Sequence, residues 1–139
     1  MKRTHDTEIL RVVDANLNRA REGFRVCEEV ARLILEDPRL TRRCQALRWE
    51  LNLRVRSFSD LELLQARNSR GDVGRPALRG RLSFHRGYRD LVIANARRAE
   101  ESLRVLEEFL RLRSPRVSQR LGSLRFRVYT LEQDLLSRL

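Results

Sequence analysis

The sequence predicts an all-α protein: a helical bundle built from two duplicated helical hairpins with a glycine-rich middle loop. Three observations lead to this prediction. Apolar residues recur at spacings of three and four over long segments, which is typical of amphipathic helices. Segments 12–33 and 91–112 are identical at 12 of 22 aligned positions, at an offset of 79 residues. No convincing strand pattern is present, because Leu82, Ser83 and Phe84 form too short a run.

The length of 139 residues suits one domain with one sizeable core. We expect a first repeat over about residues 8–56, a middle segment over about 57–87 and a second repeat over about 88–139. This division follows the repeated sequence, and it makes the whole chain a single domain.

The first repeat begins with a long helix whose apolar residues are spaced by three and four. They are Val13, Leu17, Ala20, Phe24, Cys27, Ala31 and Ile34. Asp37 and Pro38 then provide an N-cap and a proline at the first helical position, which predicts a second helix. Its apolar face is expected to hold Leu40, Cys44, Leu47 and Leu51. The two cysteines lie on apolar faces without metal-ligand spacing, so we expect two buried thiols.

The middle segment begins with a shorter helix, since Ser59 and Glu62 have the spacing of a capping box. A loop of roughly 15–18 residues follows between Ser69 and Gly87, and loops of that length are usually functional or disordered. Its turn-forming residues are Gly71, Gly74, Pro76, Gly80 and Gly87.

The second repeat has the same plan as the first. Its long helix is expected to bury Val92, Ala96, Ala99, Leu103, Leu106 and Leu110. Ser114 and Pro115 repeat the cap-and-proline pair. The following helix is expected to bury Val117, Leu121, Leu124, Val128, Leu131 and Leu135.

The charge indicates polyanionic partners. The net charge is +11, Lys2 is the only lysine, and the other 29 basic residues are arginine. This composition excludes mechanisms that need a lysine, and it suits phosphate, which the planar guanidinium binds with two oxygens at once. Nucleic acid is an unlikely partner, because the arginines are interleaved with glutamate and no set of stacking aromatics is present. Without a long apolar run or a secretory leader, we expect a cytoplasmic protein that binds no membrane.

A second stripe in each long helix is apolar at both ends and polar in the middle. The interrupting residues are Asn16, Arg19 and Gly23 in the first copy and Asn95, Arg98 and Ser102 in the second. Two arginines and two amides brought together by pseudo-symmetry would form a phosphate pocket, in which the small residues leave room for a ligand. The alternative is structural: Arg19 pairs with Glu22, Arg98 pairs with Glu101 or Glu100, and the asparagines set helix register.

A charged block, R-V-x-E-E-x-x-R, occurs in both copies. It contains Arg25, Glu28, Glu29 and Arg32, and then Arg104, Glu107, Glu108 and Arg111. One interpretation is a solvated face of helical ion pairs. The other is a ligand site, in which Arg25 and Arg104 bind substrate or nucleotide while Glu29 and Glu108 help to hold Mg²⁺.

The loop segment 67–74 combines two arginines, an aspartate and two glycines. It is expected either to close over an anion, with Arg67 binding it and Asp72 near a metal, or to be a plain surface turn. The phosphate-binding and metal-binding motifs of common enzymes are absent, and His5 and His85 are expected at the surface.

Four segments of the sequence together resemble one known family. They are the string DANLNRAREGFRV at 14–26 with its flanks at 11–29, the GDVG loop at 71–74, the A-N-x-x-R repeat at 94–98 and LRFRVYTLE at 124–132. The resemblance covers nearly the whole chain. It is to the small, all-helical hydroxymethylpyrimidine monophosphate kinase family of thiamine biosynthesis, a domain found alone or fused ahead of thiamine-phosphate synthase.

The resemblance implies ATP-dependent phosphorylation of the pyrimidine monophosphate to the diphosphate, with ATP and Mg²⁺ required. The expected partners are a phosphorylated pyrimidine and a nucleotide, with a functional link to thiamine-phosphate synthase and possible homo-oligomers. The alternatives are a non-catalytic helical module that binds the synthase or, less favoured, a nucleic-acid-binding bundle.

Within this interpretation the residue patterns assign the following roles. Catalytic roles fall to Arg19, Arg98 and Asp72, binding roles to Asn16, Asn95, Arg67, Arg25 and Arg104, and metal binding to Asp72, Glu29 and Glu108. The acceptor phosphate is already ionised near neutral pH, so the chemistry needs no general base.

Overall fold

The computed structural model describes residues 2–74 and 84–139, with side chains from residue 5 onward. These ranges contain five α-helices, one π-helical segment and no strand, which confirms the all-α prediction. The elements are α1 (Lys2–Glu29), η1 (Val30–Ile34), α2 (Pro38–Arg54), α3 (Asp60–Ala66), α4 (Tyr88–Leu110) and α5 (Pro115–Leu136). Pro76, Gly80, Leu82 and Ser83, which the sequence places in the middle loop, lie outside the described residues. No helix in the described ranges is both long and apolar enough to cross a membrane.

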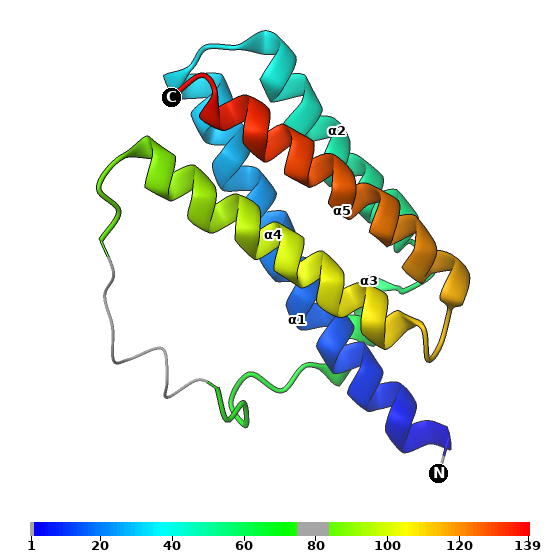
Figure 1. The fold of residues 1–139 in the computed structure, drawn as a ribbon. Helices are drawn as coiled ribbons and strands as arrows, with labels where there is room; N and C mark the ends of the chain where they lie inside the picture. Colours follow the sequence, from blue (N-terminus) through cyan, green and yellow to red (C-terminus); the bar gives the residue numbers. More distant parts are fainter. Residues whose placement is uncertain (1, 75–83) are drawn as a thin grey trace.

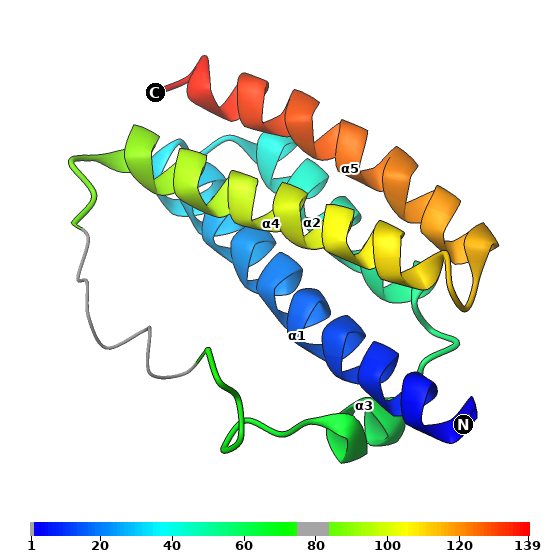
Figure 2. The same cartoon turned by 60° about the horizontal axis from the view of Figure 1, so that its bottom comes forward.

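The four long helices form a bundle in the cyclic order α1, α4, α5, α2 (Figures 1 and 2). α1 and α4 lie side by side and run antiparallel, and theirs is the most extensive interface, followed by that of α4 with α5. The short α3 packs against α1. One core connects all of these helices, and its fully buried side chains include Phe24, Leu51, Leu103 and Leu131. Nearly all of the predicted apolar positions are therefore found in the core.

Both cysteines are buried free thiols, as their positions on apolar faces predict. Burial raises the pKa of Cys27 and of Cys44 to about 12. Because the thiolate is the reactive form, neither sulfur is a nucleophile at neutral pH.

The apolar face of the first helix ends earlier than the sequence pattern predicts. Ala31 is buried, but Ile34 is 43% exposed. The cause is the π-helical turn, in which the Leu35 amide donates to the Val30 carbonyl, five residues earlier, at 2.9 Å. The wider turn changes the angle between successive residues, so the α-helical spacing no longer directs Ile34 to the core. Glu36, with φ of 49°, then reverses the chain direction before α2.

Two of the three predicted caps are confirmed. The Asp37 carboxylate accepts from the Leu40 amide at 2.9 Å, and Ser59 and Glu62 form a complete capping box. Hydrogen bonding to the Leu40 amide is the main factor that lowers the pKa of Asp37. At the start of α5, Ser114 stands at the N-cap position, but its side chain makes no capping hydrogen bond. Its backbone amide instead donates to the Leu110 carbonyl at 2.6 Å, which tightens the turn from α4.

The interface of α1 with α4 includes a very close approach at Gly23. A β-carbon on Gly23 would lie 2.5 Å from the Asn95 carbonyl oxygen and 3.3 Å from the Ala99 amide nitrogen. The prediction that Gly23 and Ser102 leave room for a ligand is therefore wrong. The backbone of α4 fills the space at Gly23, and Ser102 is buried with its hydroxyl donating to the Arg98 carbonyl at 2.7 Å.

We expect Gly23→Ala to destabilise the fold by about 2 kcal/mol, because overpacking against a backbone atom costs more than the helix propensity of alanine returns. The measurement is the midpoint of thermal or urea unfolding. Gly87→Ala is the matched control, since a β-carbon at Gly87 meets no atom within 4 Å. Equal stability of the two variants would contradict the close packing described here.

Candidate functional site

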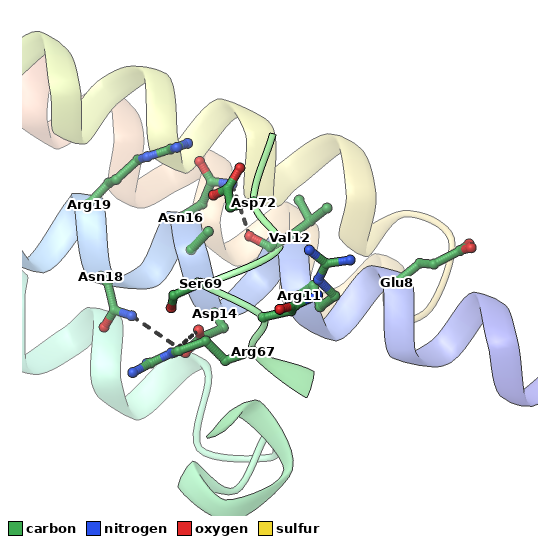
Figure 3. A pocket seen from close by; sticks show the side chains of 12 residues that line it. Glu8, Arg11, Val12, Asp14, Asn16, Asn18, Arg19, Arg67, Ser69 and Asp72 are labelled. Carbon is green, nitrogen blue, oxygen red and sulfur yellow. Dashed lines mark hydrogen bonds and ion pairs between the residues drawn. The ribbon is translucent and has the colours of Figure 1, made fainter. Parts of the chain in front are cut away.

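A cleft of about 590 Å³ lies between the middle of α1, residues 8–19, and the segment that follows α3 (Figure 3). This volume is within the range of small-molecule sites. The cleft is lined by Glu8, Arg11, Val12, Asp14, Ala15, Asn16, Asn18, Arg19, Arg67, Asn68, Ser69 and Asp72. It brings together four of the predicted site residues, namely Asn16, Arg19, Arg67 and Asp72.

The helical period explains why α1 provides one wall of the cleft. Positions 8, 11, 12, 15, 16 and 19 are three or four residues apart along one side of the helix. The neighbouring stripe, which includes Val13, Leu17 and Ala20, faces the core. Asn16 is buried at the base of the cleft, where its amide nitrogen donates to the Val12 carbonyl at 2.9 Å (Figure 3).

A buried carboxylate joins the second wall to α1. Arg67 donates to both carboxylate oxygens of Asp14, from Nε at 2.7 Å and from Nη2 at 2.8 Å (Figure 3). Asp14 is buried, and its hydrogen bond to Arg67 is the main factor that raises the pKa of the guanidinium. The two-pronged pair is geometrically specific, so Arg67 holds the segment after α3 in place.

Two further arginines of the cleft have no partner among the residues that the structure describes. Arg11 and Arg19 are exposed, and neither makes a hydrogen bond or an ion pair with any residue in the described part of the chain. In Figure 3 the Arg19 guanidinium points toward the side of the cleft where Asp72 lies. Unpaired guanidinium groups beside a concave surface are suited to bind phosphate.

Asp72 reaches the cleft on a loop with two local side-chain turns. The Asp72 Oδ1 accepts from the Gly74 amide at 2.8 Å, and the Asn68 Oδ1 accepts from the Gly71 amide at 3.0 Å. These turns fix the loop locally, as asparagine and aspartate commonly do. The second oxygen of Asp72 makes no hydrogen bond with a described residue, so it is available to a ligand.

Asn95 and Arg98, the equivalent polar residues of the second copy, do not line this cleft. Arg98 donates to Glu22 Oε2 at 2.9 Å, across the interface of α4 with α1, and both side chains are at least half exposed. The sequence suggested partners for Arg98 on its own helix, whereas the partner found here lies on the other copy. Asn95 donates to the Leu91 carbonyl at 2.9 Å, the same backbone contact that Asn16 makes in the first copy.

The expectation of a wholly solvated face of ion pairs is wrong for two glutamates. Glu28 and Glu107 are buried. Arg48 donates to Glu28 Oε2 from Nε at 3.1 Å and from Nη2 at 2.8 Å, and Arg125 donates to both oxygens of Glu107. Hydrogen bonding to Glu107 is the main factor that raises the pKa of Arg125. These pairs join α1 to α2 and α4 to α5, so their role is structural.

The remaining predicted residues also lie away from the cleft. Arg25 pairs with Glu28, and Arg104 pairs with Glu107 and Glu108. Neither Glu29 nor Glu108 is among the lining residues, so Asp72 is the one predicted metal ligand found there. Among the described residues, no group of three histidine, cysteine, aspartate or glutamate side chains is placed to hold a metal ion.

Sequence reasoning missed several lining residues, chiefly Arg11 and Asp14. Arg11 could have been found from its spacing, because it lies eight residues before Arg19 and therefore on the same side of the helix. Asp14 stands next to the apolar face, where a carboxylate needs a partner. With 29 arginines in the chain, no sequence pattern identified Arg67 as that partner.

A buried carboxyl group with a strongly perturbed pKa lies between α4 and α5. Glu100 is buried, and its Oε1 makes no hydrogen bond with a described residue. Burial, with the neighbouring Glu132 carboxyl as the second cause, raises the pKa of Glu100 to about 8. Arg97 is close to this pair, with its Nε 3.9 Å from Glu132 Oε1.

We expect the free energy of unfolding to fall as the pH rises from about 4.5 to about 8, because the folded state binds a proton at Glu100 that the unfolded chain releases. Glu100→Gln should flatten this dependence and raise the melting temperature at pH 8 by several degrees. The control is Glu108→Gln, at an exposed position of the same helix. Identical pH profiles for the parent and Glu100→Gln would contradict a protonated Glu100.

Comparisons with known proteins agree on a single family. Residues 11–134 match the model of the ThiD2 family. The chain is 41% identical to a thiamine-phosphate synthase of a Synechocystis species, over 98% of this chain and 38% of that protein. It is 38% identical to the thiamine-phosphate synthase of Nostoc punctiforme, over 92% of this chain and 35% of that protein. The chain thus spans little more than a third of the length of these relatives, and no solved structure matches it significantly.

Proposed function

This chain belongs to the ThiD2 family, and we propose that it is an ATP-dependent kinase that converts hydroxymethylpyrimidine monophosphate to the diphosphate. Its relatives are thiamine-phosphate synthases, which implies a role in thiamine biosynthesis. The structural observation that carries the proposal is the cleft with two unpaired arginines, Arg11 and Arg19. A site for phosphorylated substrates needs such uncompensated positive charge.

The reaction requires little proton chemistry from the protein. The acceptor is a phosphate that is already largely ionised, so no base is needed to activate it. The main obstacle is the repulsion between two polyanions, and the main catalytic task is to hold them in line while stabilising the charge on the transferred group. Arg11 and Arg19 provide positive charge and directional donors for this task.

Other residues of the cleft hold these groups in position. Asp14 and Arg67 keep the loop against α1, and the loop carries Asp72 to the cleft. Asp72 has one carboxylate oxygen available, which fits a magnesium ion that is bound mostly by phosphate oxygens and water. When bound, Mg²⁺ would neutralise phosphate charge. Closure of the loop over the substrates would exclude water and strengthen these charge interactions.

Arg19→Lys is expected to lower kcat/KM about 10-fold or more, which corresponds to roughly 1.4 kcal/mol, because lysine keeps the charge and loses the two-pronged contact. Its melting temperature should not change, since Arg19 is exposed and has no partner among the described residues. The assay is steady-state turnover of ATP with hydroxymethylpyrimidine monophosphate and Mg²⁺. Arg120→Lys, an exposed arginine on α5, is the matched control.

Two further variants locate the site. Arg98→Lys should have a smaller effect than Arg19→Lys, because Arg98 pairs with Glu22 outside the cleft. Asp72→Asn should depress turnover and leave the melting temperature nearly unchanged, because the side chain is exposed on a loop. Full activity of both the Arg19 and the Asp72 variants would place the active site elsewhere.

We also infer that the two hairpins arose by duplication. The repeated sequence supports this, and so do two matching contacts made by three pairs of equivalent residues. Asn16 and Asn95 bond the carbonyl four residues earlier, Glu28 and Glu107 occupy equivalent buried positions, and Arg48 and Arg125 pair with them. Superposition of residues 12–51 on 91–128 should reproduce the crossing of each helix pair.

A second candidate function is a non-catalytic module that binds thiamine-phosphate synthase. It is favoured by two exposed aromatic residues, Trp49 on α2 and Phe126 on α5. A parent protein that lacks turnover but binds a purified thiamine-phosphate synthase would support this function over the kinase.

A further inference from the structure

A second cavity, of about 580 Å³, lies between the start of α1 and the end of α4. Its apolar wall is formed by Ile9, Val12, Phe109 and Leu112. Phe109 is 38% exposed and Leu112 is 75% exposed, so both present apolar surface to solvent. His5, Asp6 and Glu8 stand at its polar edge, where His5 Nδ1 lies 3.3 Å from Glu8 Oε2.

This cavity adjoins the arginine-lined cleft on α1. Glu8 and Val12 line both, so the two hollows share a wall on α1. The shared wall also brings cationic and apolar side chains close together. Arg11, which lines the cleft, is adjacent in sequence to Val12, which lines the apolar cavity. A cationic cleft and an apolar cavity therefore lie next to each other along α1.

We infer that the apolar cavity binds the planar heteroaromatic ring of a phosphorylated substrate whose phosphate lies in the cleft. This inference rests on the proposed function and deepens it. A ring gains free energy by covering Phe109 and Leu112, and it can stack on the face or edge of the phenyl group. The two unpaired arginines then meet the phosphate that the same molecule carries.

The distance from the cavity to each arginine along α1 distinguishes the two substrates that could provide the ring. Residues of an α-helix advance by about 1.5 Å each, so Ile9 and Arg19 are roughly 15 Å apart along the axis, whereas Ile9 and Arg11 are roughly 3 Å apart. A nucleoside triphosphate with its base in the cavity extends far enough to reach Arg19. The short pyrimidine monophosphate in the same position would reach Arg11 alone.

The experiment measures dissociation constants by titration calorimetry on the full chain with three ligands: ATP, hydroxymethylpyrimidine monophosphate and inorganic tripolyphosphate, which has no ring. The variants are Phe109→Leu and Leu112→Ser, with Leu61→Ser as the matched control because Leu61 is exposed on α3. We expect Leu112→Ser or Phe109→Leu to weaken one ring-bearing ligand at least 5-fold while the affinity for tripolyphosphate stays unchanged. Arg19→Ala should weaken tripolyphosphate.

The variants in which each ligand loses affinity identify which ring the cavity binds. If ATP weakens in both the apolar variants and Arg19→Ala, the cavity binds the nucleotide base. If the pyrimidine monophosphate weakens in the apolar variants and is insensitive to Arg19→Ala, the cavity binds the pyrimidine. Unchanged affinity for both ring-bearing ligands in both apolar variants overturns the inference, even when turnover is normal. Ring-dependent binding without turnover would retain the inference and reject the kinase.

Discussion

The close approach of α1 and α4 at Gly23 fixes the alignment on which the apolar cavity depends. The two helices are antiparallel and have the same rise per residue. A step toward the N-terminus of α1 therefore corresponds to an equal step toward the C-terminus of α4. Gly23 meets Asn95, and 14 residues away in each helix Ile9 and Phe109 line the apolar cavity together. A shift of one turn at the crossing would separate these two residues and remove the apolar cavity.

Buried carboxylates that pair with arginines join segments that are distant in the sequence. Glu28, Glu107 and Asp14 are each buried and each accept two hydrogen bonds from one arginine, and each pair joins two segments that are distant in sequence. Removing one partner from such a pair leaves an uncompensated buried charge, which is strongly destabilising. The pairs therefore define how α2, α5 and the loop after α3 sit against the two central helices.

The fold followed from local patterns, and the site did so only in part. Apolar spacing, proline at the first helical position and the capping box depend on neighbours within a few residues. The positions of the helices could therefore be predicted closely. The sequence could place Asn16 and Arg19 on one side of a helix. It could not show that Glu22 neutralises Arg98, that Asp14 engages Arg67, or that Gly23 contacts the facing backbone. Those contacts depend on how distant segments pack.

The abundance of arginine is therefore less informative than the distribution of its partners. Arg48, Arg125 and Arg67 bind buried carboxylates and hold the fold, whereas Arg11 and Arg19 have no partner in the described chain. A guanidinium that is already bound to a carboxylate can bind phosphate only after it gives up that contact. An unpaired guanidinium beside a concave surface loses only hydration when an anion arrives. The arginines of the cleft that pair with no described residue, rather than the net charge of +11, are thus the feature that supports the proposal of phosphorylated ligands.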